Sequence, residues 1–295
     1  MSSHTTSQPR RAAIAQLCST SHKLHNLVNV AKCAGWAQRE GASILFLPEC
    51  FGFIGESGRQ TVEQADPPVV VGDVPVEYAN DASISELLET TVAAAANGET
   101  SVDESTVPND NLCILDALKT IATKSGLWIS GGGMHIAGAP PAEGSNLPRV
   151  YNTHIIMDNQ GVVKCLYRKI HLFNVHIPDK VNLRESDTTA PGTELVVCDS
   201  PIGKLGLSTC YDIRFPEMYI PLVNQMGAQI LLVPSAFTVP TGSAHWHTLL
   251  RARAIEHQCY VLAAAQYGRH NHKRESYGEL HRATQAPRSS SAWVS

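Results

Sequence analysis

The chain has 295 residues, of which 43% are hydrophobic and 17% charged, with a formal net charge of -4 and a pI near 6.3. A chain of this length can bury a substantial core as one large domain or two ordinary ones. The slightly acidic balance gives no reason to expect nucleic acid as a partner. No apolar run approaches the roughly 20 residues that a membrane span needs, so we expect no membrane segment.

Strand-like and helix-like segments alternate along the chain. In the N-terminal half we expect strands at 12–17, 43–49 and 127–133, helices at 21–39 and 111–126, and a hairpin over 152–169. In the C-terminal half we expect strands at 203–210, 228–236 and 259–266 and helices at 214–227 and 244–258. This alternation predicts an α/β protein whose helices cover buried sheets. The pattern alone does not choose between a doubly wound sheet and a sandwich of two sheets.

Two segments depart from this alternation. Residues 60–118 contain no Lys or Arg while acidic residues recur, and we interpret about 60–110 as an inserted acidic loop that is mobile. A docking surface is the less favoured alternative for this loop. Residues 279–295 have no period of two or of 3.6, which predicts an unstructured tail after a domain over 12–278.

The N-terminus and the cysteines indicate the compartment. The first twenty residues lack the apolar segment of a secretory signal, although Arg10 and Arg11 among Ser and Thr leave a weak transit signal open. None of the eight cysteines forms a Cys-x-x-Cys pair, which is typical of a reduced intracellular protein rather than a disulfide framework or a zinc site. We therefore expect a cytoplasmic protein, or a mitochondrial one, without a bound metal.

Three polar residues each end an apolar strand, namely Glu49, Lys169 and Cys210. Because α/β proteins place their sites at strand ends, these residues form a candidate cysteine-nucleophile site. A cationic neighbour and the helix after Cys210 would lower the pKa of its thiol. The carboxylate could take and return a proton, and Lys169 with the backbone N–H of Tyr211 could stabilise an oxyanion. From spacing alone, a buried structural cysteine stays an equal alternative.

Four ordered segments around these residues resemble the nitrilase superfamily: "FLPECFGFIG", "YRKIHLFNVHIP", "LGLSTCYDIRFPEMY" and "LLVPSAFTVPTGSAHWHTLLRARAIEHQ". The resemblance runs from about residue 12 to residue 278. It is narrower to the Nit branch, the amidases that act on deaminated glutathione and on ω-amides of 2-oxo acids. It implies an α-β-β-α sandwich and a Glu-Lys-Cys triad. Glu49 would then be the general base and acid, Lys169 the stabilising cation and Cys210 the nucleophile.

The resemblance also implies a second glutamate in the loop before the "YN" that begins the hairpin. Ile136 stands near the usual place of this glutamate, so we assign the role to Glu143, the only acid in that loop before Tyr151. His247 is another departure, because the family usually has Glu after the "AHW" tryptophan. An acid missing there would weaken the positioning of substrate or triad.

Other expected roles follow from the same resemblance. Tyr211 would donate its backbone N–H to the oxyanion, and Phe237 and Thr238 would lie near the substrate. The helix after Cys210 would help to build a homodimer. Relatives continue beyond residue 278 with further strands and a tail, and that pattern does not follow here. The resemblance therefore implies a C-terminally truncated fold with an open sheet edge and reduced stability.

The resemblance, together with the three strand-end residues, implies an amidase without a cofactor. It would hydrolyse the C–N bond of a small carboxylated amide, deaminated glutathione first, through a Cys210 thioester with release of ammonia or amine. The alternatives are an ω-amidase on 2-oxo acid amides and a truncated, non-catalytic variant. A cysteine protease would need a histidine beside Cys210, and His171 and His245 are candidates by position only. The glycines at 131–133 lack the rest of a dinucleotide-binding fingerprint.

Overall fold

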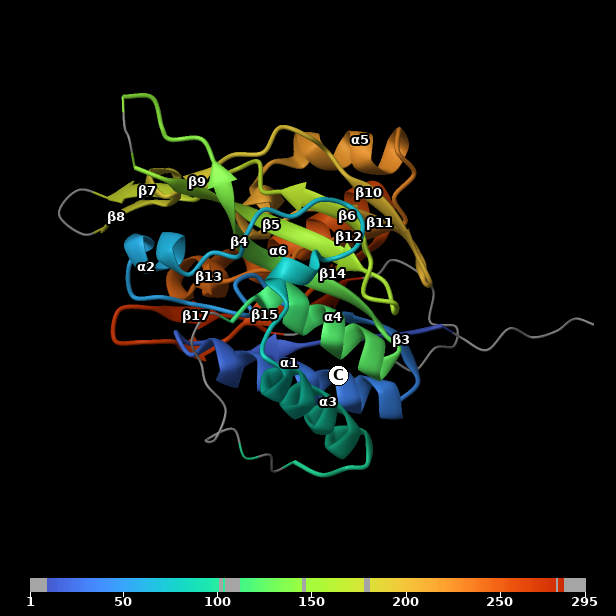
Figure 1. The fold of residues 1–295 in the computed structure, drawn as a ribbon. Coiled ribbons are helices and arrows are strands. Elements are labelled where there is room, and N and C mark those ends of the chain that lie inside the picture. The colour runs from blue at the N-terminus through green and yellow to red at the C-terminus, as the bar shows by residue number, and fades with distance from the viewer. Residues whose placement is uncertain are drawn as a thin grey trace, which may run out of the picture.

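The protein is built from two stacked β-sheets with helices on their outer faces (Figure 1). The structure, a computed structural model, describes residues 10–100, 103, 112–144, 147–177, 181–279 and 281–283. The predicted α/β class is confirmed, and the layers are those of an α-β-β-α sandwich.

The larger sheet has six strands and combines parallel with antiparallel pairing. Its parallel part consists of β1 (Arg11–Ile14), β3 (Ala42–Phe46) and β4 (Trp128–Ala139). The strands β5 (Arg149–Met157) and β6 (Val163–Arg168) continue it antiparallel, and β9 (Thr189–Ala190) pairs with β5. The predicted hairpin is therefore confirmed as β5–β6, joined by a tight turn in which Gly161 donates to the carbonyl of Asp158.

Strand alternation in β3 explains how this sheet separates two cores. Leu45 packs in the core formed with the helices, whereas Ile44 and Phe46 pack in the core formed with the second sheet. Because successive side chains of a strand point to opposite faces, both faces of this sheet are buried. The helical layer consists of α1 (Lys23–Arg39), α3 (Ala82–Ala96) and α4 (Ile114–Ser125), which lie together in Figure 1.

The second sheet has the strand order β10-β11-β12-β14-β18. These strands span β10 (Val197–Ser200), β11 (Gly203–Leu207), β12 (Ile230–Leu232), β14 (Tyr260–Ala263) and β18 (His281–Ala283). The helices α5 (Tyr219–Asn224) and α6 (Val239–His257) belong to this half of the molecule. Trp246 of α6 is almost completely buried and packs with Phe237 at 5.1 Å between ring centroids.

Short elements complete the fold around the two sheets. Two strand pairs are β2 (Gln16–Leu17) with β15 (Ala265–Gln266) and β7 (Asn174–Ile177) with β8 (Val181–Arg184). A three-stranded ribbon consists of β13 (Phe237–Thr238), β17 (Glu275–Tyr277) and β16 (Gly268–Arg269). The remaining elements are the helix α2 (Gly58–Glu63) and the 3₁₀ turns Val76–Tyr78, Glu185–Asp187, Cys210–Arg214 and Pro216–Met218.

The acidic segment is not the mobile loop that its composition predicted. Its central part forms α3, which buries Ile84, Leu88 and Val92 in the helical layer. The apolar side chains recur at helical spacing, and Asp81 caps the helix by accepting the backbone N–H of Ser83 at 2.8 Å. The rest of the predicted loop, at 101–102 and 104–110, lies outside the described residues.

Gly35 of α1 allows α1 and α3 to approach closely. A Cβ at this position would lie 2.4 Å from the Val92 carbonyl oxygen and 2.6 Å from the Ala95 Cβ. We therefore expect Gly35→Val to lower the free energy of unfolding by about 3 kcal/mol, because overpacking a close contact costs roughly this much. Urea denaturation measures this change. The control is Gln38→Val on the exposed face of the same helix, which should change stability by no more than about 0.5 kcal/mol.

Two predictions for the C-terminal half need correction. The expected helix over 214–227 is two 3₁₀ turns followed by the short helix α5, because Pro216 starts a new turn and has no N–H to continue the first. Residues 281–283, expected to be part of an unstructured tail, form β18 and pair antiparallel with β14. Residues 280 and 284–295 lie outside the described part. Among the described residues, no helix has both the length and the apolar character needed to cross a membrane.

Candidate active site

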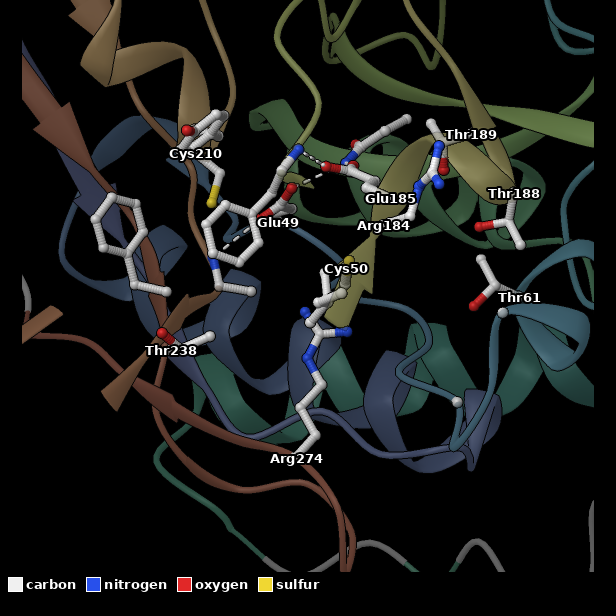
Figure 2. Close-up of a pocket in the computed structure, with 18 of the residues that line it drawn as sticks. Glu49, Cys50, Thr61, Arg184, Glu185, Thr188, Thr189, Cys210, Thr238 and Arg274 are labelled. Atoms are coloured by element: carbon white, nitrogen blue, oxygen red, sulfur yellow. Dashed lines mark hydrogen bonds between the residues drawn. The ribbon is translucent and has the colours of Figure 1, made fainter. Parts of the chain in front are cut away.

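Three strand ends bring a carboxylate, an ammonium and a thiol together, as expected from the sequence. Glu49 follows β3, Lys169 follows β6, and Cys210 begins the 3₁₀ turn after β11. The three residues are 4%, 2% and 8% exposed, so the cluster is largely shielded from water. Figure 2 shows the Cys210 sulfur directed toward Glu49.

The Glu49 carboxylate is fixed by three donors. One oxygen accepts from Lys169 Nζ at 3.0 Å and from Asn152 Nδ2 at 2.8 Å. The other accepts from the backbone N–H of Ala236 at 3.0 Å. A buried carboxylate requires such partners, and together they hold its position relative to the thiol.

Two glycines of β4 allow this arrangement. A Cβ at Gly132 would lie 2.2 Å from the carbonyl oxygen of Leu47, and one at Gly133 would lie 2.6 Å from Asn152 Oδ1. Gly133 also accepts the backbone N–H of Cys50 at 2.7 Å, directly after Glu49. The Leu47 backbone beside Gly132 and the Asn152 side chain beside Gly133 thus leave no room for a Cβ at either position.

Cys210 sits in a strained and firmly anchored turn. Its φ of 52° lies in the left-handed region, which is uncommon for a residue with a side chain and recurs at functional sites. Its N–H donates to the carbonyl of Pro234 at 2.9 Å. Two residues later, fully buried Asp212 accepts from Thr209 N at 2.9 Å and from the Tyr167 hydroxyl at 2.6 Å. The turn is therefore held from both sides.

The sequence led us to expect a lowered pKa for the Cys210 thiol, and this expectation was wrong. Burial, followed by the charge of Glu49, raises the pKa of the Cys210 thiol well above its usual value, and Lys169 offsets this only in part. Burial also opposes ionisation of Glu49, but Lys169 and a hydrogen bond from Cys210 lower its pKa below the usual value. Burial lowers the pKa of Lys169, yet Glu185 and Glu49 outweigh it and raise that pKa. The resting site therefore pairs a neutral thiol with a carboxylate that can accept its proton.

The second acid of the site is Glu185, which we did not identify from the sequence. Its carboxylate accepts from Lys169 Nζ at 3.0 and 3.2 Å and from the backbone N–H of Phe173 at 2.7 Å. Our assignment of Glu143 was wrong: that residue is exposed and does not line the site cavity. Ile136, near the place where we expected an acid, is buried in the helical-side core.

The β7–β8 hairpin explains why Glu185 was missed. It carries the chain away from Lys169 and back, so that Glu185 follows β8 and returns to the ammonium. Contact here depends on a long-range fold rather than on local spacing. The only local signal is an acid placed directly after a strand-like segment.

A cavity of about 820 Å³ opens beside the cluster. Tyr211, Phe237 and Thr238 line it, together with all three clustered residues. Cavity-lining residues that we did not single out from the sequence include Cys50, His135, Arg184, Lys273 and Arg274. Arg184, Lys273 and Arg274 are cations that can attract an anionic ligand, although four glutamates also line the cavity. The imidazole of His135 adds no charge, because burial lowers its pKa to about 4.

The two departures from the family pattern lie outside this cavity. His247 projects from α6 and contacts Glu279, with 2.9 Å between its Nε2 and the carboxylate. It does not line the cavity, and neither does Ile136. A histidine at position 247 therefore leaves the contacts of the Glu49 carboxylate intact.

A model of the family described as "Carbon-nitrogen hydrolase" matches residues 11–279 of this chain. The chain belongs to the carbon–nitrogen hydrolase family. This hydrolase is 41% identical over 272 residues to the deaminated glutathione amidase of Dictyostelium discoideum, covering 91% of this chain and 78% of that protein. It is 40% identical over 267 residues to the deaminated glutathione amidase of Bos taurus, covering 90% and 67%.

Solved structures agree with this assignment. The hydrolase superposes on the crystal structure of the C. elegans NitFhit protein with a TM-score of 0.69 and 36% identity, covering 92% of this chain and 55% of that one. It superposes on Saccharomyces cerevisiae Nit3, a member of branch 10 of the nitrilase superfamily, with a TM-score of 0.67, 26% identity and 92% and 81% coverage. The chain thus spans about half the length of the NitFhit protein.

The hydrolase also contains a buried neutral histidine next to the segment that precedes Cys210. His154 is fully buried between Ser130 Oγ at 2.8 Å and the carbonyl oxygen of Ser208 at 3.1 Å. Burial lowers its pKa to about 4, because the imidazolium would lose its hydration. Since the unfolded chain binds a proton below about pH 6.5, the native state loses stability between pH 6.5 and 4.

We expect this one group to lower the free energy of unfolding by about 2 kcal/mol between pH 7 and pH 5. Urea denaturation at the two pH values measures the loss. His154→Gln should be less stable at pH 7 but lose less on acidification, whereas exposed His22→Gln should behave as the unsubstituted protein does. An unchanged pH dependence in the His154 variant would refute this assignment.

Proposed function

We propose that this carbon–nitrogen hydrolase is an amidase in which Glu49, Lys169 and Cys210 carry the chemistry. The observation that supports this proposal most strongly is their convergence: a thiol, a carboxylate and an ammonium from three strand ends meet at one buried point on a large cavity. A thiol nucleophile with an adjacent base is the arrangement that acyl transfer requires.

In the first half-reaction, Cys210 Sγ attacks the amide carbonyl carbon while its proton passes to Glu49. The raised pKa of the thiol and the ionised state of Glu49 favour this coupled transfer over a preformed thiolate. The negative charge that develops on the carbonyl oxygen is stabilised by Lys169 and by the backbone N–H of Tyr211. Collapse breaks the C–N bond, and Glu49 returns the proton to the leaving nitrogen.

The second half-reaction hydrolyses the thioester. Glu49 takes a proton from water, which attacks the acyl carbon, and the carboxylic acid leaves as the proton returns to Cys210 Sγ. Glu185 keeps Lys169 in place throughout, since both of its carboxylate oxygens accept from the ammonium. Every step uses groups of this chain and water.

The substrate that we favour is deaminated glutathione. Relatives of 41% and 40% identity carry that activity in their names. This molecule has two carboxylates and no ammonium, which suits a cavity lined by Lys169, Arg184, Arg214, Lys273 and Arg274. Its leaving group is an amine of a dipeptide, whereas the smaller ω-amides of 2-oxo acids, the second candidates, would release ammonia.

A panel of amides tests this proposal. We expect purified protein to hydrolyse deaminated glutathione with a higher kcat/KM than the ω-amides, measured as released amine and ammonia, with circular dichroism to verify folding. A preference for the ω-amides would identify the second candidate function. A folded protein without activity on any member would refute the amidase and favour the non-catalytic alternative.

We also propose a homodimer through the segment after Cys210, in a protein of the cytoplasm or the mitochondrion. Ile220 of α5 is 49% exposed, and an apolar side chain there is available for a partner. We expect sedimentation to show a dimer, and Ile220→Asp to convert it to a monomer of unchanged secondary structure. A monomer in the unsubstituted protein at high micromolar concentration would contradict this interface.

A further inference from the structure

Two cationic side chains of the cavity, those of Lys273 and Arg274, form no hydrogen bond or ion pair with any residue that the structure describes. Arg184 pairs with Asp187 at 3.4 Å, and Arg214 contacts His245 Nδ1 at 3.1 Å. The guanidinium of Arg274, by contrast, forms no hydrogen bond or ion pair with any residue that the structure describes. Figure 2 shows it rising from its loop toward Cys50 and Glu49, into the space beside the catalytic cluster.

The acids on the same wall are already engaged. Glu275 lies 3.6 Å from Arg269, and Glu56 lies 3.7 Å from His272. Arg274 therefore keeps its charge available to the cavity. That charge reaches the cluster, since it lowers the pKa of Glu49 after the larger effects of burial and Lys169.

The loop that carries Arg274 is fixed by its own hydrogen bonds. Asn271 Oδ1 accepts the backbone N–H groups of Lys273 at 2.9 Å and Arg274 at 3.0 Å. The amide of Asn271 donates to the Gly55 carbonyl at 3.3 Å, and His270 N–H donates to the Arg274 carbonyl at 3.0 Å. The loop between β16 and β17 is thus tied to itself and to Gly55, which limits the directions that Arg274 can take.

We propose that Arg274 binds a carboxylate of the substrate and thereby makes this hydrolase selective for anionic amides. A guanidinium presents a planar fork of donors that matches both oxygens of a carboxylate. An unpaired guanidinium directed into the cavity is attracted to a ligand that carries the opposite charge. This assignment rests on the proposed function, because it assumes that an amide occupies the cavity.

The carboxylate that we assign to Arg274 is the one on the acyl side of the scissile bond. Deaminated glutathione and the ω-amides of 2-oxo acids share that group, whereas only the former has a carboxylate on the amine side. An acyl-side contact also persists in the thioester after the amine has left. Arg274 would then orient both half-reactions.

Kinetics with charged and uncharged substrates test the proposal. Glutaramate has the acyl-side carboxylate, its methyl ester lacks it, and N-butyrylglycine has a carboxylate only on the amine side. We expect Arg274→Gln to raise the KM for glutaramate by about 10- to 100-fold, because a charge-assisted hydrogen bond is lost. The KM values for the ester and for N-butyrylglycine should change by no more than about twofold. The control Arg59→Gln removes an exposed cation that does not line the cavity, and it should change the KM of every substrate by no more than about threefold.

Equal losses for glutaramate and its ester would overturn the proposal, because they would indicate a structural role. A loss confined to N-butyrylglycine would overturn the acyl-side assignment. Calorimetric titration of Cys210→Ala protein with glutaramate separates this proposal from the proposed function, since it needs no turnover. There, adding Arg274→Gln should weaken binding by about 10- to 100-fold. Unchanged affinity would refute the role of Arg274 even in an active amidase, and weakened affinity would support it even if no amide were hydrolysed.

Discussion

Replacing Cys210 with alanine is expected to lower kcat/KM for deaminated glutathione on the order of 10⁴- to 10⁶-fold, as the removal of a catalytic nucleophile does elsewhere. The thiol is the atom that forms the thioester, and no other group of the cluster can replace it. Alanine is smaller and adds no charge, so Glu49 keeps its contacts with Lys169, Asn152 and Ala236. Amine release and urea denaturation of the same sample separate lost chemistry from lost folding.

A matched control is Cys259→Ala, because Cys259 is as buried as Cys210, at 8% exposed, and lies outside the cavity. We expect that variant to keep its kcat/KM within about threefold while losing on the order of 1 kcal/mol of stability. If the Cys210 variant kept more than a hundredth of the activity, a different nucleophile or direct attack by water would have to replace this account.

Replacing Glu185 with glutamine is expected to lower kcat by about 10²- to 10³-fold, the loss typical for one electrostatic contact of an active site. In the unsubstituted protein, Lys169 Nζ lies 3.0 Å from a carboxylate oxygen of Glu49 and 3.0 Å from one of Glu185. Without the Glu185 charge, the ammonium acts on Glu49 alone and lowers its pKa further, so Glu49 becomes a weaker base.

The pH dependence of kcat/KM shows in which direction the Glu185 substitution shifts the pKa of Glu49. A carboxylate whose pKa falls stays ionised to lower pH, so the acidic limb of kcat/KM should move to lower pH while the plateau falls. The matched control is Glu143→Gln, an exposed acid outside the cavity, which should change neither quantity by more than about twofold. An acidic limb that moved to higher pH, or an unchanged plateau, would contradict the role of Glu185.

The sequence was most informative where chemistry coincides with a strand end. Glu49, Lys169 and Cys210 each follow an apolar strand, and polar groups at such strand ends commonly form the sites of α/β proteins. The strands β3 and β6 that precede Glu49 and Lys169 belong to one sheet, and β11, which precedes Cys210, belongs to the other. Glu185 depends instead on the hairpin that folds back to Lys169, which residue spacing does not encode. The raised pKa of Cys210 likewise comes from three-dimensional burial and from a carboxylate that is distant in the sequence.

Composition was a weaker guide than periodicity in the acidic segment. Residues 82–96 lack basic side chains and were predicted as a loop, although Ile84, Leu88, Val92 and Ala95 follow a helical repeat. That stripe packs against α1, where Gly35 removes the side chain that would collide with it. The helical spacing of the apolar residues was therefore the better predictor of the structure of this segment than the charge of its exposed face.

The most direct test of this account is to detect the acyl group on Cys210 during turnover. Protein mixed rapidly with deaminated glutathione and quenched in acid should gain the mass of the acyl part in the intact-protein mass spectrum. Peptide mapping should place that mass on the tryptic segment 205–214, and Cys210→Ala protein should remain unmodified. Steady hydrolysis with no acyl-enzyme at any quench time, together with activity in the Cys210 variant, would contradict the thioester mechanism and with it the role of this cluster.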